Sequence, residues 1–78
     1  MSEKYELISK NLAEVIKRRR RELGYSQEKF ADEIGVDRTY MSKIERSIGN
    51  PSLQKLVLIA SGLRCSLTDL FSEVEFEP

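Results

Sequence analysis

The sequence of 78 residues contains no histidine and a single cysteine, and these scarcities exclude several kinds of protein. Cys65 cannot form an internal disulfide, so nothing indicates an oxidising compartment. With no histidine and only one cysteine, the chain also lacks the ligand set of a zinc-type metal site. No nucleophile–base pair, phosphate-binding loop or pair of acids at catalytic spacing occurs either. We expect no enzyme, no cofactor and no metal, and we interpret Cys65 as a buried or half-buried packing residue.

Long apolar runs are missing as well. No run approaches the ~20 residues that a membrane helix needs, and the polar start MSEKYE is no signal peptide. The hydrophobic share of 40% and the charged share of 33% are typical of an ordinary globular protein. The sequence predicts one small cytoplasmic domain over residues 1–78, with no membrane contact and no evident small-molecule ligand.

Net charge is the third absence, since thirteen basic residues balance thirteen acidic ones. Residues 10–46 nevertheless hold ten lysines and arginines against seven acids, whereas residues 66–78 hold four acids and no base. The chain thus has a basic front and an acidic tail. This segregation is compatible with a surface that binds nucleic acid.

The residues that are present favour helices, because no stretch alternates cleanly between apolar and polar side chains. An apolar stripe runs from Leu7 to Leu23, and we expect Gly24 to end that helix. The expected N-caps of four shorter helices are Ser26, Asp37, Ser52 and Ser66.

Glycines and a capping pair predict how the later helices begin and end. Gly35 and Gly62 should close the helices that begin at Ser26 and Ser52. Asp69 follows Ser66 by three residues, which predicts a capping box. Residues 72–78 have no clear period, and we expect them to be frayed or packed on a partner.

The segment SQEKFADEIGVDRTYMSKIER, residues 26–46, predicts a helix-turn-helix. Ala31 is small where the two helix backbones should approach each other, and Gly35 stands where the turn needs a positive φ. The inward-facing positions carry Ile34, Val36, Met41 and Ile44.

Residues 12–71 resemble a Cro/C1-type (XRE-family) DNA-binding domain, which implies a compact all-α, five-helix, lambda-repressor-like fold. The segment SQEKFA is similar to that family's entry into its second helix, and IERSIGNPS to its passage out of the third. Within the family, DRTYMSKIER followed by NPS looks most like the controller proteins of restriction–modification systems, which are small dimeric autoregulators. Short repressors of prophage or plasmid type share much of the pattern.

Two segments of the chain depart from the family pattern. Arg19 stands where the first helix usually has an apolar residue. Ser47 and Ile48 stand where a glycine and a polar or basic residue are usual, which removes one possible phosphate contact and alters the path of the turn.

A recognition helix reads bases with side chains on one exposed face near its N-terminus. Arg38, Thr39, Ser42 and Lys43 share such a face, so we expect them to contact bases or phosphates. Arg38 could bond guanine O6 and N7, and Thr39 could touch a thymine methyl. The alternative for all four residues is an ordinary solvated helix face.

The phosphate contacts follow from helix ends and from the resemblance. Ser26 and Gln27 lie at a helix N-terminus, which attracts anions, and Gln27 resembles a family glutamine that binds phosphate and braces the recognition helix. Arg46 resembles a family phosphate contact, although a cation also suits a helix C-terminus. Tyr40 has two interpretations, contact with the DNA backbone or packing against the helix of residues 26–35.

The basic run KRRRR, residues 17–21, cannot all face one duplex, because consecutive helical residues point in different directions. Arg20 matches a family arginine that pairs with a glutamate, here Glu45, and we expect a structural ion pair. Lys17 and Arg21 share one face and remain open between the DNA backbone and solvent.

The sequence therefore predicts a transcriptional regulator that binds a two-fold-related operator in double-stranded DNA as a homodimer. The expected dimer contact lies in the helices of residues 52–71, because the one beginning at Ser52 is apolar around most of its circumference. The residues expected in this contact are Leu58, Leu63, Leu67, Leu70 and Phe71. The alternative for them is the core of their own chain, where several must serve. The alternative from another class is an antitoxin-like protein-interaction module whose helix-turn-helix no longer reads DNA.

Overall fold

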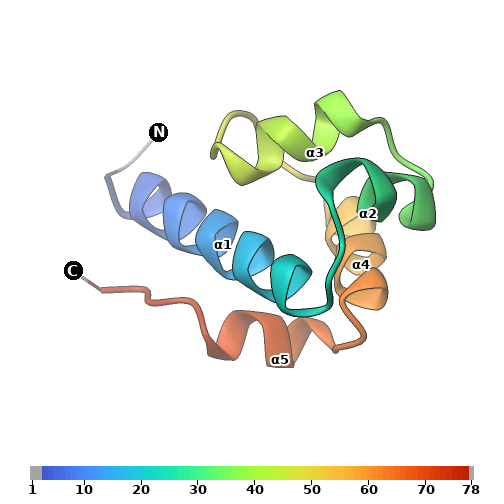
Figure 1. Ribbon diagram of the computed structural model, residues 1–78. Coiled ribbons are helices and arrows are strands. Elements are labelled where there is room, and N and C mark those ends of the chain that lie inside the picture. The colour runs from blue at the N-terminus through green and yellow to red at the C-terminus, as the bar shows by residue number, and fades with distance from the viewer. Residues whose placement is uncertain (1–2, 78) are drawn as a thin grey trace.

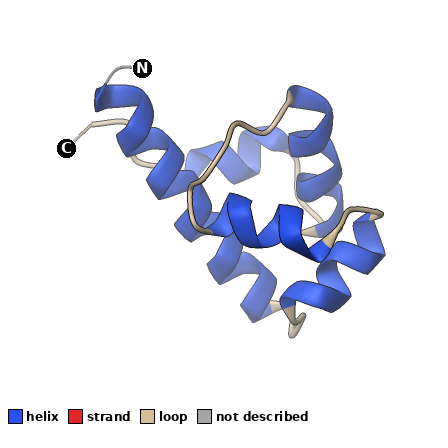
Figure 2. Cartoon of the chain, turned by 90° about the horizontal axis from the view of Figure 1, so that it is seen from above, coloured by secondary structure: helices blue, strands red, loops and turns tan. Residues whose placement is uncertain are grey.

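Five helices make up the protein in a computed structural model that describes residues 3–77. They are α1 Glu3–Glu22, α2 Gln27–Ile34, α3 Arg38–Glu45, α4 Leu53–Gly62 and α5 Leu67–Ser72 (Figure 1). Short loops join them, and no strand occurs in the described range (Figure 2). The expected all-α, five-helix fold is confirmed. None of the described helices is long and apolar enough to cross a membrane.

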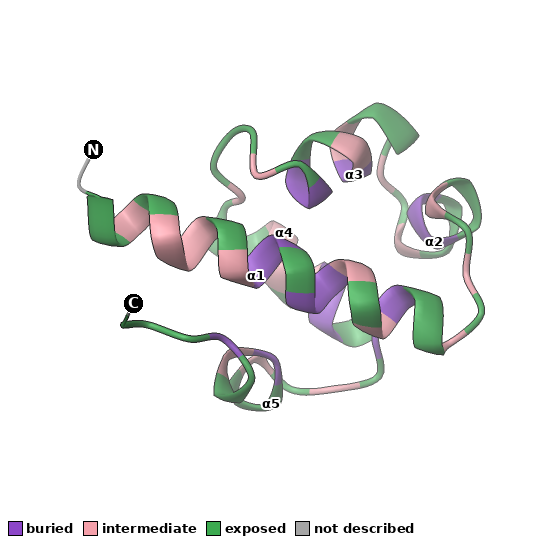
Figure 3. Cartoon of the chain, turned by 60° about the vertical axis from the view of Figure 1, so that its left-hand side comes forward, coloured by how far each residue is buried: buried purple, intermediate pink, exposed green. Residues whose placement is uncertain are grey.

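One apolar core receives a face of every helix. Figure 3 shows the buried positions on the sides of the helices that face one another. The largest fully buried side chains are Phe30, Ile16, Met41, Ile59 and Leu70. They come from five different helices, so the core itself sets how the helices lie.

The expected helix caps are present. Ser26, Asp37, Ser52 and Ser66 each accept a hydrogen bond from a backbone N–H of the helix that follows. Ser66 and Asp69 form the full capping box. Such caps satisfy amide groups that a helix N-terminus leaves without partners.

The helix-turn-helix is compact because its close contacts fall on small residues. Ala31 is fully buried, and Gly35 ends α2 with φ of 76°, which glycine accepts without steric cost. Gly62 brings α4 against α2: a Cβ atom there would lie 2.4 Å from Cγ2 of Ile34. Glycine at position 62 thus sets the distance between α2 and α4.

The C-terminal tail corrects one expectation. From Glu73, which pairs with Arg18 and Arg19, to Glu77, the tail packs along α1 of the same chain (Figure 1), rather than fraying or packing on a partner. Pro78 lies outside the described residues. Val74 is 5% exposed, Asn11 Nδ2 donates to the carbonyl oxygen of Glu75 at 2.9 Å, and Lys4 pairs with Glu77. The tail is fixed by one buried apolar side chain and by charge complementarity with α1.

Candidate nucleic-acid interface

The outer face of α3 carries hydrogen-bond donors, and its inner face carries apolar side chains. Met41 and Ile44 are buried in the core. The outward positions expected to contact DNA are exposed at Arg38, Thr39, Lys43 and Arg46 and half-buried at Ser42. A helix of eight residues with one polar exposed side has the form needed to enter a major groove.

A buried ion pair ties α3 to α1. Arg20 Nε donates to Glu45 Oε2 at 2.6 Å, and Arg20 Nη2 donates to Glu45 Oε1 at 2.9 Å. The same guanidinium also donates to the carbonyl oxygen of Tyr25 at 2.6 Å. Both residues are less than 10% exposed, so this two-pronged pairing holds the C-terminal end of α3 in place.

The start of α2 joins this network. Gln27 Nε2 donates to Glu45 Oε1 at 3.1 Å, so one N–H of its side-chain amide braces α3 while the second remains for another acceptor. Ser26 Oγ accepts from the backbone N–H of Lys29 at 3.1 Å. Both residues stand at the N-terminus of α2, which is where an anion is favoured.

Tyr40 is packed inside its own chain. Its ring lies against the core cluster, and Lys55 Nζ of α4 is 5.7 Å from the ring centroid. The hydroxyl is enclosed and has no hydrogen-bond partner in the described part of the chain. This burial raises the pKa of the Tyr40 phenol. Of the two sequence interpretations, packing within the chain describes this conformation, and the ring has Lys55 of α4 as a neighbour.

The basic run divides between different partners. Arg18 and Arg19 both pair with Glu73 just beyond α5, and Arg18 also pairs with Glu22. Arg19 therefore serves an ion pair at the position where the family pattern has an apolar residue. Lys17 and Arg21 lie on the surface of α1 beside Glu14, Arg18 and Glu22, and their contact with the DNA backbone stays a prediction.

The expected dimer residues need a correction. Leu63 and Leu70 are 3% and 0% exposed, because both fill the core of their own chain, so they cannot form a surface contact. Leu58, Leu67 and Phe71 are half-buried and reach the surface.

Three exposed apolar side chains were missing from that expectation, namely Leu53, Val57 and Phe76. Leu53 and Val57 are 69% and 49% exposed on the outer side of α4. The apolar circumference of α4 predicted that this helix has a second apolar side, but it did not predict which of its residues form that side.

Comparison with known proteins adds a family and several relatives. Residues 16–70 match the helix-turn-helix family model HTH_3. The chain is 46% identical over 61 residues to control protein C.MunI of a Mycoplasma species, covering 78% of this chain and 82% of that protein. It is 34% identical over 65 residues to control protein C.SmaI of Serratia marcescens, covering 83% and 77%.

Solved structures give the same picture. The wild-type restriction–modification controller protein C.Esp1396I superposes with a TM-score of 0.75 at 42% identity, covering 85% of this chain and 84% of that one. The tetramer of that controller protein, in complex with its natural 35-base-pair operator, also gives a TM-score of 0.75 at 42% identity. That match covers 85% of this chain and 86% of that one.

Proposed function

This chain belongs to the HTH_3 helix-turn-helix family, and from that premise we propose that it is a DNA-binding transcriptional regulator, the controller protein of a restriction–modification system. It binds a two-fold-related operator as a homodimer and recognises its sequence. The relatives named as control or controller proteins, at 34–46% identity, support this proposal. So does the relative that was crystallised on its operator.

The observation that carries the proposal is a rigid helix with an outward face of donors. The buried pair of Arg20 and Glu45, together with Gln27, holds α3 against α1 and α2. Side chains that read bases need a fixed backbone, because a small displacement lengthens every hydrogen bond at once. Nothing in the described chain covers the exposed side of α3.

The polar residues divide into two roles. Arg38 and Thr39 stand on the first turn of α3 and contact base edges, whereas Ser42 and Lys43 contact bases or phosphates one turn later. Ser26, Gln27 and Arg46 contact phosphates, which fixes the position of the protein and carries no sequence information. Tyr40 reaches the DNA backbone only if its ring leaves the packed position.

The dimer follows from α4. Its inner side is buried in the core, and its outer side carries Leu53, Val57 and Leu58. A second copy that covers this side, together with Leu67 and Phe71 of α5, places two α3 helices on one face of DNA. Two half-sites about 34 Å apart are needed because one short helix reads only a few base pairs. A regulator of this kind acts in the cytoplasm, on the nucleoid.

Binding to selected DNA tests the proposal. Duplexes enriched from a random library by the parent protein are compared with unselected duplex at several salt concentrations. We expect tight, salt-dependent binding with preference for the selected sequence, and an inverted repeat within it. Absence of salt-dependent binding to any duplex would favour an antitoxin-like interaction module. A neighbouring methyltransferase or endonuclease gene supports the controller role over that of a prophage- or plasmid-type repressor.

Two variants separate the roles on the same duplexes. Arg38→Ala should lose about 1–3 kcal/mol of specific binding and relax the preference at one base pair of each half-site. Arg46→Ala should weaken binding to selected and unselected DNA alike, and should reduce the salt slope by about one unit. A sharp change of base preference in Arg46→Ala would contradict its assignment to phosphate.

A further inference from the structure

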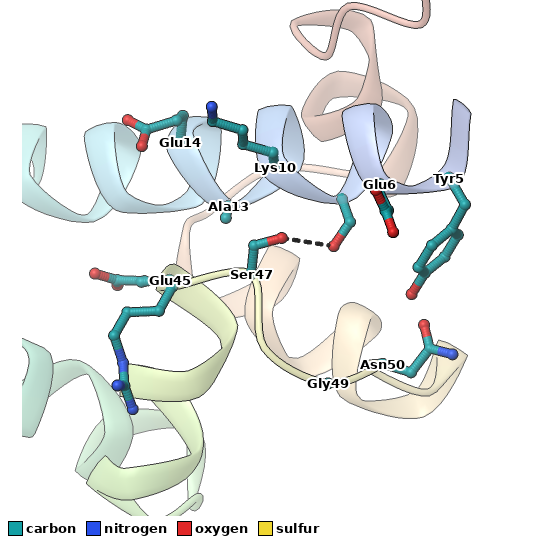
Figure 4. A pocket seen from close by; sticks show the side chains of 11 residues that line it. Tyr5, Glu6, Lys10, Ala13, Glu14, Glu45, Ser47, Gly49 and Asn50 are labelled. Atoms are coloured by element: carbon teal, nitrogen blue, oxygen red, sulfur yellow. Dashed lines mark hydrogen bonds between the residues drawn. The ribbon is translucent and has the colours of Figure 1, made fainter. Parts of the chain in front are cut away.

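A cleft of about 740 Å³ separates the N-terminal half of α1 from the turn that follows α3. One wall consists of α1 residues from Tyr5 to Glu14, and the other of turn residues from Glu45 to Asn50. Figure 4 shows the two walls facing each other, with a hydrogen bond from Ser47 reaching across. The partner of Ser47 is Ser9, and their Oγ atoms are 3.0 Å apart in a part-buried position.

Ser47 stands in an unusual backbone conformation. Its φ is +60°, in the left-handed region that residues other than glycine seldom occupy. Such a conformation persists where surrounding contacts hold it. The turn has little apolar anchorage of its own, because Ile48 is 49% exposed and the next residue is Gly49, with φ of +90°. Two backbone hydrogen bonds close the turn, from the Ser47 N–H to the Ile44 carbonyl oxygen at 3.1 Å and from the Ile48 N–H to the Lys43 carbonyl oxygen at 2.8 Å. The side-chain bond of Ser47 adds the contact that ties this closed turn to α1.

Arg46 lies directly before this turn, at the C-terminal end of α3. Its backbone N–H bonds to the carbonyl oxygens of Ser42 and Lys43, and its Nε donates to the Ser42 carbonyl oxygen at 3.3 Å. The Arg46 side chain is exposed. The bond between Ser9 and Ser47 is therefore a side-chain tie between α1 and the residue that follows Arg46.

We infer that Ser9 is a positioning residue for DNA binding, which acts through its hydrogen bond to Ser47 and thereby orients Arg46 toward a phosphate. This inference rests on the proposed function. The N-terminal half of α1 can serve as the fixed support because the C-terminal tail holds it. Asn11 bonds the Glu75 carbonyl oxygen, and Lys4 pairs with Glu77.

The test measures binding of the full chain to a fluorescein-labelled duplex of random sequence, long enough for two half-sites, at several salt concentrations. Ser9→Ala removes the hydrogen bond and favours the α1 helix, so the fold should remain. We expect affinity to fall about threefold to tenfold, as for loss of one neutral hydrogen bond, with a shallower salt slope. Ser9→Thr keeps the hydroxyl and should bind like the parent.

A double-mutant cycle distinguishes positioning from general stability. In an Arg46→Ala background, Ser9→Ala should cause little further loss, because the charge that it orients is already gone. Ser47→Gly accepts the backbone conformation but lacks the hydroxyl, so it should weaken DNA binding as much as Ser9→Ala does. Adding Ser9→Ala to Ser47→Gly should then cause no further loss of affinity. It also serves as the working variant if Ser9→Ala does not fold.

Either of two results would overturn the inference. One is parental binding by Ser9→Ala or, where that variant does not fold, by Ser47→Gly. The other is a double variant whose loss of DNA affinity equals the product of the losses caused by Ser9→Ala and Arg46→Ala separately. If the parent itself bound no duplex, the proposed function would fall and this inference with it. If the parent binds DNA and Ser9→Ala binds equally well, the inference about Ser9 is wrong while the proposed function stands.

Discussion

Helices α3 and α4 have similar lengths and both contribute to the core, yet they present opposite surfaces to the outside. The outer side of α3 carries Arg38 and Lys43, whereas the outer side of α4 carries Leu53 and Val57. A charged side is stable in water without a partner. An apolar side gains about 25 cal/mol for each Å² that another surface covers. The comparison supports the proposal that α3 binds DNA and that α4 binds a protein partner.

The two helices are also held in place by different forces. Glu45 at the end of α3 is fixed by the buried guanidinium of Arg20, in a directional pair of hydrogen bonds. Helix α4 is fixed by apolar packing of Ile59 and Ala60, and by the close approach at Gly62. Orientation is therefore specified most strictly at α3, where DNA recognition demands it.

The largest expected effect comes from placing a charge on the apolar side of α4. Val57→Glu should give folded monomers, and operator affinity should fall about a thousandfold toward the non-specific level because only one half-site is read. Sedimentation gives the oligomeric state, and circular dichroism checks the fold. Leu58→Glu should behave in the same way. Val57→Ala should have a dimer stability and an operator affinity between those of Val57→Glu and the parent. Dimers in both glutamate variants would refute the assigned interface.

Breaking the polar attachment of α3 should have the next largest effect. Arg20→Ala leaves the Glu45 carboxylate buried without its cation, and the free energy of unfolding should fall by about 3–5 kcal/mol. Urea denaturation measures the loss. Arg18→Ala is the matched control in the same helix, since its ion pairs lie in solvent and its loss should be much smaller. Equal losses in the two variants would show that burial of the pair is unimportant.

The joint between α2 and α4 offers a test of packing alone. In Gly62→Ala the added methyl would meet Ile34 at 2.4 Å and the ring of Phe30 at 3.0 Å. The helices must move apart, which should lower the free energy of unfolding by about 1–3 kcal/mol. Ser61→Ala, at the exposed preceding position, should change it by less than about 0.5 kcal/mol. A stabilised Gly62→Ala would mean that helix propensity outweighs the close contact.

The smallest expected effect is on the stability of the protein at acidic pH, through the ion pairs of Glu73 in the tail. Hydrogen bonds from Arg18, and then from Arg19, lower the pKa of Glu73 below its ordinary value of 4.5. The stabilisation from this carboxylate is therefore complete above about pH 4.5 and is lost as pH falls through the lower folded-state value. Glu73→Gln should flatten the acid limb of a plot of urea midpoint against pH.

The control for this experiment is Glu75→Gln. The side chain of Glu75 takes part in none of the ion pairs found between residues 3 and 77. Its acid limb should match that of the parent. Identical curves for the two variants would mean that the ion pairs of Glu73 do not contribute to the pH dependence of stability.

Much of the helix-turn-helix could be predicted because its signals are local. Ser26 and Asp37 cap helices through amides two or three residues away, and Gly35 meets a backbone demand of its own turn. The pairing of Arg20 with Glu45 came from the family resemblance, since 25 residues separate the two in sequence. Base and phosphate contacts remain predictions that the binding experiments must decide.

The prediction was weakest where apolar residues crowd together. Leu63 and Leu70 were placed in the dimer contact and lie in the core, while Leu53 and Val57 lie outside. Periodicity identifies an apolar side of a helix, but in α4 nearly every side is apolar. The choice between core and surface then depends on where α1 and α2 stand.

By itself the sequence determined the helices, their caps and the kind of side chain on α3, because each follows from residues within one or two turns. Only the tertiary structure decided which leucines fill the core, where the tail runs and how the turn after α3 is held. Those outcomes rest on pairs such as Ser9 with Ser47 and Lys4 with Glu77, which are 38 and 73 residues apart. Contacts over such separations form only when the packed core brings the helices together, so no local pattern encodes them.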